Sequence, residues 1–161
     1  GGDTVEAMQA SAAELRQFYL DVLAPRGLKV EYHNHATDIQ PRFDGKTQVD
    51  ILLESVPELG FQPDTGNAFV GGQTDTLAFL RHYGDRITCL HVKDIREEHQ
   101  ELESGHGRCA VGEGVLDIAG AVAYARSLGV EDFIVEQEGG QTDAEIEGVL
   151  ERSYASLSAL L

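Results

Sequence analysis

Four short apolar segments, each followed by a stretch of helical periodicity, constrain the fold of this chain more than any other feature. The apolar segments predict strands near residues 28–33, 59–63, 86–94 and 132–136. A further helical pattern precedes the first strand, over residues 5–24. Strands that alternate with helices in this way form parallel sheets, because each helix returns the chain to the same edge. The sequence therefore predicts an α/β fold of parallel β/α units.

Capping residues set the expected helix boundaries. Thr or Asp followed three residues later by an acidic residue predicts a helix start at residues 3–6, 47–50 and 142–145. Two further helices are expected to begin near residues 74–75 and 117. Proline or glycine is expected to end the helices, at Pro25 and Gly27, Pro57, Gly84 and Gly129. The polar, glycine-containing segment 95–114 predicts a long loop of the kind that covers or completes a site.

Charge and composition argue against two classes of partner. The net charge of the 161 residues is −16, which would repel a phosphate backbone and disfavours nucleic-acid binding. No apolar run approaches the roughly 20 residues that span a membrane, and the first residues lack a signal-peptide pattern. Cys89 and Cys109 have neither disulfide-framework nor zinc spacing and are expected to be reduced thiols. A cytoplasmic enzyme is the resulting expectation.

Polar side chains gather where each predicted strand ends. Side chains alternate along a strand, so apolar neighbours such as Val30, Leu90, Val92 and Val135 lie on the opposite face. In parallel β/α folds, sites form at these strand ends. The polar groups are Glu31, His33 and His35 on the first strand, Asp64 and Asn67 after the second, Cys89, His91 and Lys93 on the third, and Glu136 and Glu138 on the fourth.

These groups predict a metal site, although a simpler explanation exists for each one. Carboxylates with one imidazole suit Mn²⁺, Mg²⁺ or Co²⁺, with Zn²⁺ as a further candidate. Alternatively, Asp64 forms an Asx turn and His91 is a hydrogen-bonded core histidine. The remaining carboxylates would then be loop starts or helix caps. Polar ends on all four strands favour the metal site over these separate explanations.

Five motifs resemble those of the xylose isomerase-like TIM barrels. They are Val30–His35 (VEYHNH), Asp64–Asn67 (DTGN), His91–Asp94 (HVKD), Val111–Gly114 (VGEG) and Ile134–Glu136 (IVE). This superfamily includes ketose 3-epimerases, hydroxypyruvate isomerases, inosose dehydratases and sugar phosphate isomerase/epimerase proteins. The resemblance extends from about residue 30 to the final helix.

The resemblance implies one divalent metal ion held at the ends of barrel strands five to eight. By order and motif the implied ligands are Glu31, Asp64, His91 and Glu136, with Glu138 as the alternative to the last. Glu31 and Glu136 would also act as catalytic bases on opposite faces of a bound sugar.

Further residues of the matching motifs are expected to contact substrate. His33 and Lys93 are expected to be catalytic, since they would stabilise an oxyanion or move a hydroxyl proton. His35, Asn67, Arg96 and Glu113 are expected to bind substrate, together with Lys93. The Arg96 match is loose, and Asn67 stands where relatives often have a histidine.

Two departures from the family pattern bear on function. Apurinic endonucleases of the superfamily use additional histidines, and here Asn67 replaces one while the segment around residues 106–108 lacks their Asp-x-His. This argues against DNA repair. The second departure is length, because a complete barrel has eight strands and about 250 residues. The chain therefore looks like a single C-terminal half-barrel, residues 1–161, with four strands.

A half-barrel would have two open sheet edges and an exposed apolar inner face. We therefore expect a homodimer or pairing with a complementary half-barrel, or else that the chain is a fragment of a longer product. The implied function is a divalent-metal-dependent sugar isomerase or epimerase that acts on a ketose or related polyol through a metal-stabilised enediolate. One alternative is an inosose-type dehydratase, with His33 or His35 as the acid. Another is a noncatalytic barrel fragment that folds as an oligomer.

Overall fold

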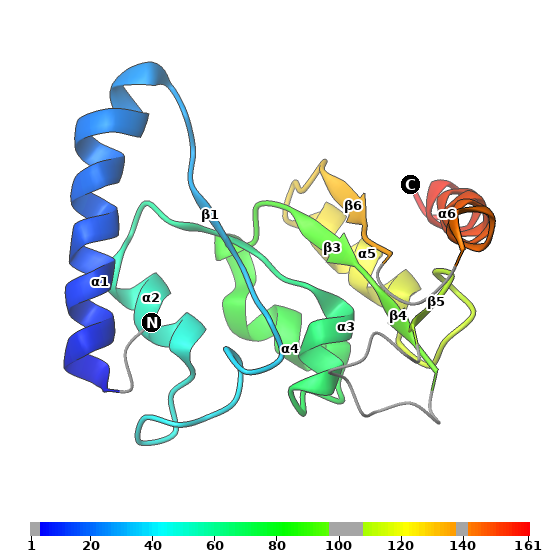
Figure 1. The fold of residues 1–161 in the computed structure, drawn as a ribbon, viewed down its shortest axis with the longest axis horizontal. Coiled ribbons are helices and arrows are strands. Elements are labelled where there is room, and N and C mark those ends of the chain that lie inside the picture. Colours follow the sequence, from blue (N-terminus) through cyan, green and yellow to red (C-terminus); the bar gives the residue numbers. More distant parts are fainter. Residues whose placement is uncertain (1–3, 97–107, 138–141) are drawn as a thin grey trace.

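Four short parallel strands form one curved row. The computed structural model describes residues 4–96, 108–137 and 142–161 (Figure 1). Within them, β1 pairs with β2, and β3 pairs with β6, all in parallel. Single parallel bridges, Phe61 with Ile87 and Asp64 with His91, join β2 to β3. The row therefore has the order β1–β2–β3–β6. The strands are β1 Glu31–His33, β2 Gly60–Gln62, β3 Leu90–Val92 and β6 Phe133–Val135.

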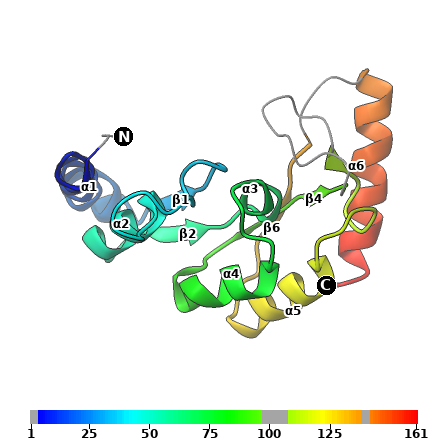
Figure 2. The same cartoon turned by 90° about the horizontal axis from the view of Figure 1, so that it is seen from below.

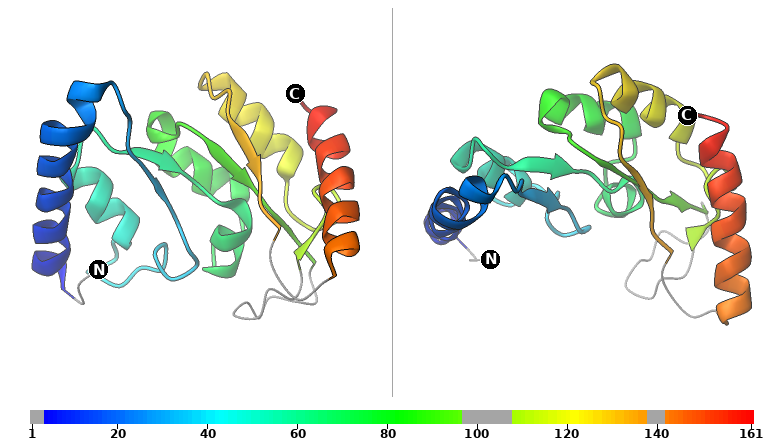
Figure 3. Two further views of the ribbon diagram at one scale, coloured as in Figure 1. Left: turned by 45° about the horizontal axis from the view of Figure 1, so that its top comes forward. Right: turned by 90° about the horizontal axis from the view of Figure 1, so that it is seen from above.

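The helices follow an arc along the outer side of this row. Figure 2 and the right-hand view of Figure 3 show α1 and α2 beside β1, α4 and α5 beside the middle strands, and α6 at the other end. This is the arrangement of part of a β/α barrel, and it is not closed. The helices are α1 Val5–Phe18, α2 Gln48–Ser55, α3 Thr65–Val70, α4 Thr76–Tyr83, α5 Ile118–Ser127 and α6 Asp143–Ser158.

The predicted caps fix most of these helix boundaries. Thr47 and Asp50 form a capping box at α2, and Thr142 with Glu145 forms one at α6. Asp117 accepts a hydrogen bond from the Gly120 amide at the start of α5. The first helical stretch extends beyond α1 as a π-helical turn, Tyr19–Leu23, and a 3₁₀ turn, Ala24–Arg26. It ends before Gly27, whose φ of 68° is left-handed.

Several short elements depart from the prediction. The expected strand at residues 86–94 divides into β3 and β4 (Asp94–Ile95), preceded by a 3₁₀ turn at Gly84–Arg86. β4 pairs antiparallel with β5 (Arg108–Cys109), within the segment expected to be a loop. The helix α3 directly after β2 was also not predicted. None of the helices in the described residues has the length and apolarity needed to cross a membrane.

The hydrophobic core lies between the strands and the helices. Phe61, Leu90 and Val92 point from the strands into this layer and are fully buried. The opposite face of the strands, here called the concave face, carries Glu31, His33, Gly60, Gln62, His91, Ile134 and Glu136. The prediction of an apolar inner face is therefore wrong for the described strands, where the exposed Ile134 is the large hydrophobic residue among polar side chains.

Candidate metal centre

Four side chains from the ends of four different strands converge on the concave face. His33, Asp64, His91 and Glu136 each offer a ligand atom, and these atoms all lie within 4.8 Å of one another. His33 ends β1, Asp64 follows β2, His91 lies in β3 and Glu136 follows β6. The parallel order brings together residues that are far apart in sequence, because every strand ends at the same edge. The convergence predicted for Asp64, His91 and Glu136 is therefore present.

The structure places His33, rather than Glu31, in this group. Glu31 lies on the same face but two residues earlier in β1, where it pairs with Gly60 in register. Two residues along a strand correspond to about 6–7 Å, so Glu31 lies well below the strand ends. Its carboxylate is exposed and accepts a hydrogen bond from Gln62 Nε2 at 3.3 Å. The four-residue group therefore contains His33 and does not contain Glu31, whose role as a ligand stays a prediction.

Lys93 supplies the positive charge inside the group. Its ammonium is 2.9 Å from Asp64 Oδ2 and 3.1 Å from Glu136 Oε2, and its side chain is 2% exposed. His91 Nδ1 lies 3.1 Å from the same Glu136 oxygen. Burial alone would raise the pKa of Glu136, but hydrogen bonds from Lys93 and His91 outweigh it and lower this pKa. The carboxylate is therefore ionised at neutral pH.

His33 is held as a neutral imidazole. Desolvation, followed by the proximity of His91, lowers the pKa of His33, and the nearby carboxylates of Asp64 and Glu136 only partly offset this. The His33 and His91 rings lie 4.2 Å apart between centroids. A neutral imidazole has a lone pair available for a metal ion or for a substrate proton.

The DTGN motif explains how the Asp64 carboxylate is positioned. Asp64 is fully buried and caps α3, since its Oδ1 accepts from the Asn67 amide at 2.7 Å. Thr65 Oγ1 donates to the Lys93 carbonyl at 2.7 Å and accepts from the Lys93 amide at 3.0 Å. A Cβ on Gly66 would lie 2.7 Å from Lys93 Cβ, so only glycine permits this approach. The motif therefore joins the start of α3 to the end of β3.

Asn34 joins β1 to β2 immediately beside the site. Pro63 stands where the β1–β2 ladder would continue, and proline has no amide hydrogen to donate. Instead, the fully buried Asn34 side chain accepts the Asp64 amide at 2.9 Å. The Asn34 carbonyl in turn accepts from Asn67 Nδ2 at 3.1 Å. Asn34, which the sequence prediction did not assign a role, thus fixes His33 relative to Asp64.

Asp94 holds the backbone of residues 112–116 in place. Its carboxylate is buried and accepts hydrogen bonds from the backbone amides of Ile95, Gly112, Gly114 and Leu116, at 2.9 to 3.2 Å. The VGEG motif therefore serves chiefly to wrap the backbone of the loop around one carboxylate. Asp94, Gly112 and Gly114 therefore have a structural role, which is to hold this loop.

The remaining predicted residues lie at different distances from the group. The His35 ring packs edge-on against His33, with centroids 5.4 Å apart, and is largely exposed. Asn67 is buried and engaged with Asn34. Glu113 accepts a hydrogen bond at 2.6 Å from Nε of Arg152, which lies in α6. Arg96 lies close to the Cys109 thiol and favours a lower pKa of that thiol. Glu138, the alternative ligand, lies outside the described residues, as does most of the segment around residues 106–108.

Both cysteines are free and both are buried. Burial raises the pKa of the Cys109 thiol to about 11, with nearby Asp94 contributing. Burial also raises the pKa of Cys89. Neither thiol belongs to the four-residue group. Both therefore remain protonated side chains of the packed interior at neutral pH.

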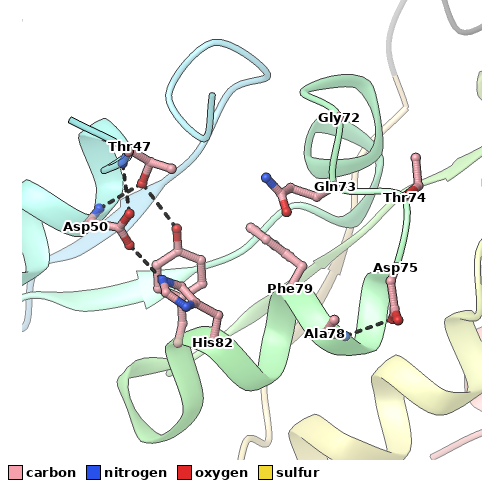
Figure 4. A pocket seen from close by; sticks show the side chains of 11 residues that line it. Thr47, Asp50, Gly72, Gln73, Thr74, Asp75, Ala78, Phe79 and His82 are labelled. Atoms are coloured by element: carbon pink, nitrogen blue, oxygen red, sulfur yellow. Dashed lines mark hydrogen bonds and ion pairs between the residues drawn. The ribbon is translucent and has the colours of Figure 1, made fainter. Parts of the chain in front are cut away.

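A cavity of about 430 Å³ lies elsewhere, between α2 and α4 (Figure 4). It contains none of the four converging residues. Its polar side chains are already engaged, because His82 Nε2 lies 2.9 Å from Asp50 Oδ1 and Asp75 caps α4. The convergence of donors, rather than this cavity, identifies the candidate site.

The donor set fits a divalent metal ion. Two imidazoles and two carboxylates at this spacing suit Zn²⁺, Mn²⁺ or Co²⁺. One buried atom of the group, His33 Nδ1, has no hydrogen-bond partner within the part of the chain that the structure describes, whereas Asp64 Oδ2 is paired with the Lys93 ammonium at 2.9 Å. Such buried polar atoms are costly unless something pairs with them. His33, Asp64, His91 and Glu136 would hold the ion.

The fold and the site together define a partial β/α barrel with a candidate metal site at its strand ends. Residues 1–160 match the family described as xylose isomerase-like TIM barrel, and the chain belongs to this family. Among curated relatives, an inosose dehydratase of Geobacillus kaustophilus is 35% identical over 99 residues. That match covers 58% of this chain and 31% of the relative.

Solved structures show the same fold. A sugar phosphate isomerase/epimerase from Parabacteroides distasonis has a TM-score of 0.75 at 21% identity, covering 97% of this chain and 53% of that one. The IOLI protein with a binding zinc atom has a TM-score of 0.71 at 14% identity, covering 98% and 57%. The chain therefore spans about half the length of these barrels and less than a third of the curated relative.

Proposed function

We propose that this chain forms the metal-binding half of an isomerase or epimerase that acts on a ketose or related polyol. The observation that supports this most directly is the convergence of His33, Asp64, His91 and Glu136 within 4.8 Å. The zinc atom in the IOLI protein and the name of the Parabacteroides protein support the metal and the reaction class. When bound, a divalent ion would supply Lewis acidity that polarises a carbonyl and its neighbouring hydroxyl.

The chain's own residues then have distinct roles in this proposal. Glu136, ionised and about one-third exposed, removes the proton next to the substrate carbonyl and, in isomerisation, returns it to the neighbouring carbon. The Lys93 ammonium stabilises the developing oxyanion. Proton transfer by His33 stays a prediction, because the one lone pair of its neutral ring would be used by the ion. The exposed ring of His35, next to His33, contacts the sugar hydroxyls. For Asn67, Arg96 and Glu113, substrate contact stays a prediction, as does a catalytic role for Glu31.

The curated relatives favour a second candidate reaction. The inosose dehydratases match this chain at 35% and 37% identity over about half of its length. In a dehydratase the same proton is removed, but a β-hydroxyl then leaves as water. The exposed ring of His35 is the acid that protonates it, since His33 is neutral and would be bound to the ion. Incubation with a ketose and with an inosose distinguishes the two, because only the dehydratase gives a product that has lost water by mass spectrometry.

Metal stoichiometry tests the proposed site directly. We expect wild-type protein loaded with Co²⁺ and gel-filtered to retain one ion per chain. Asp64→Asn and His91→Ala should each lose it, because each removes a converging donor. Glu31→Gln is the matched control on the same concave face and should retain the ion. Equal stoichiometry in all four proteins would contradict the site. Stoichiometric metal without turnover of either substrate would instead favour the noncatalytic fragment.

A further inference from the structure

Lys93 contacts the oxygens that a metal ion would need. Its ammonium lies 2.9 Å from Asp64 Oδ2 and 3.1 Å from Glu136 Oε2, so it bridges two carboxylates from different strands. Asp64 Oδ1 already accepts the Asn67 amide at 2.7 Å, which leaves Oδ2 as the oxygen available to a ligand. The ammonium therefore occupies the coordination side of Asp64.

Lys93 has little freedom to withdraw. The side chain is 2% exposed, and its backbone amide and carbonyl are both bonded to Thr65 Oγ1. If Gly66 carried a Cβ, that atom would lie 2.7 Å from the Cβ of Lys93. The helix α3 therefore packs directly against the base of the Lys93 side chain. An ion bound to Asp64 Oδ2 at about 2.1 Å could lie no farther than about 5 Å from Nζ. At that distance the two positive charges repel strongly in a partly buried site.

We propose that Lys93 is a built-in competitor of the metal ion, which stabilises the carboxylates in the absence of an ion and weakens ion binding. The inference rests on the proposed metal site and goes beyond it, because it assigns Lys93 a role opposite to that of a ligand. Asp64 and Glu136 bear two negative charges, and Lys93 compensates one of them. Binding of a divalent ion brings a second cation to these same oxygens, within about 5 Å of the ammonium, so the two positive charges oppose one another.

Two measurements on Lys93→Met follow from this competition. Co²⁺ titration, followed by visible absorption, should give a dissociation constant at least tenfold lower than that of the wild type. Thermal unfolding in EDTA should occur at a lower Tm, since Asp64 is then buried without its counter-charge. Addition of Co²⁺ should raise the Tm of the variant more than that of the wild type. Lys93→Gln, which is neutral but polar, gives a second test if Lys93→Met is not folded by circular dichroism.

Two variants serve as controls. Lys46→Met makes the same change in a surface pair, where Nζ lies 2.6 and 2.8 Å from the Glu54 oxygens and both side chains are more than half exposed. Its Co²⁺ affinity should equal that of the wild type. Lys93→Arg keeps the charge and should not bind Co²⁺ more tightly than the wild type.

The outcomes separate this inference from the proposed site. Tighter Co²⁺ binding by both neutral variants, even where the wild type binds weakly, supports the competition. Unchanged or weaker binding by folded Lys93→Met and Lys93→Gln, with His91→Ala still abolishing it, overturns the competition and leaves the metal site intact. Absence of Co²⁺ binding in the wild type and in both neutral variants overturns both.

Discussion

Much of the candidate site could be predicted from the types and positions of single residues. Asp64, His91 and Glu136 were predicted from their positions at strand ends, and the structure brings them together. The choice of Glu31 over His33 could not be settled this way, because alternation identifies the face of a strand but not the height along it. That height depends on the register of β1 against β2, which Pro63 and Asn34 help to set. Such cross-strand hydrogen bonds leave no periodic pattern in a sequence.

Gly114 is the residue whose replacement we expect to be most disruptive at this scale. An added Cβ would lie 2.1 Å from Asp94 Oδ1 and 2.5 Å from the Ile95 carbonyl oxygen. Backbone and a buried carboxylate cannot move away without loss of the hydrogen bonds that hold the loop. Gly114→Ala should therefore lower the free energy of unfolding by about 2–4 kcal/mol, measured by urea denaturation.

Gly148→Ala is the matched control for this substitution. Gly148 lies inside α6, where an added Cβ would meet only Arg152 Nη1 at an ordinary 3.7 Å. Alanine has a higher helix propensity than glycine, so this variant should gain about 0.5–1 kcal/mol. A Gly114→Ala variant as stable as the wild type would show that Asp94 does not hold this loop.

At the scale of elements, the sequence predicted helices better than strands. Thr47, Asp117 and Thr142 form local hydrogen bonds at helix starts, so the helix boundaries were readable from spacing alone. The β4–β5 pair depends instead on Asp94, whose bonds reach residues 18 to 22 positions away. The short α3 likewise depends on Thr65 and its bonds to β3. Elements stabilised by distant partners give no local signal.

The link between α2 and α4 predicts a pH-dependent contribution to stability. Asp50 accepts from the Thr47 amide and pairs with His82 of α4 (Figure 4). Burial opposes ionisation, but these bonds outweigh it and lower the pKa of Asp50 below its usual value of 3.8. Because the folded-state pKa is the lower one, the stabilisation is present above the unfolded-state value and is lost as the pH falls through the folded-state value.

Asp50→Asn should therefore be costly at neutral pH and nearly neutral in acid. We expect a loss of about 1 kcal/mol in the free energy of unfolding at pH 7, and almost none once the pH has fallen below the folded-state pKa of Asp50. Thr47→Ala removes the hydroxyl that accepts the Asp50 amide and that also helps to lower the pKa of Asp50, so part of its cost should likewise be lost in acid. A pH-independent cost for Asp50→Asn would contradict the role of its charge.

The whole molecule has two sheet edges that the described residues leave open. β1 pairs only with β2, and β6 only with β3, within the described part of the chain. Exposed hydrophobic residues lie at the same two ends, Phe18, Leu20 and Leu28 beside β1 and Leu150, Tyr154 and Leu161 on and after α6. Their presence agrees with the predicted pairing of two halves, which stays a prediction.

We expect the chain to associate with itself in a manner that depends on salt. Two copies with a net charge of −16 each repel one another, and added salt screens that repulsion. Sedimentation equilibrium should therefore show a monomer–dimer equilibrium that shifts toward the dimer as the salt concentration rises. A monomer at every protein and salt concentration would rule out the homodimer and favour a complementary half as the partner.

The join between β2 and β3 has a mechanical consequence. Only the bridges of Phe61 with Ile87 and Asp64 with His91 cross it in the described ladder, whereas three residue pairs link β1 to β2 and three link β3 to β6. Two donors of the candidate centre, Asp64 and His91, stand on opposite sides of this seam. An ion bound by both would add a link across this join, so ion binding should slow amide exchange there.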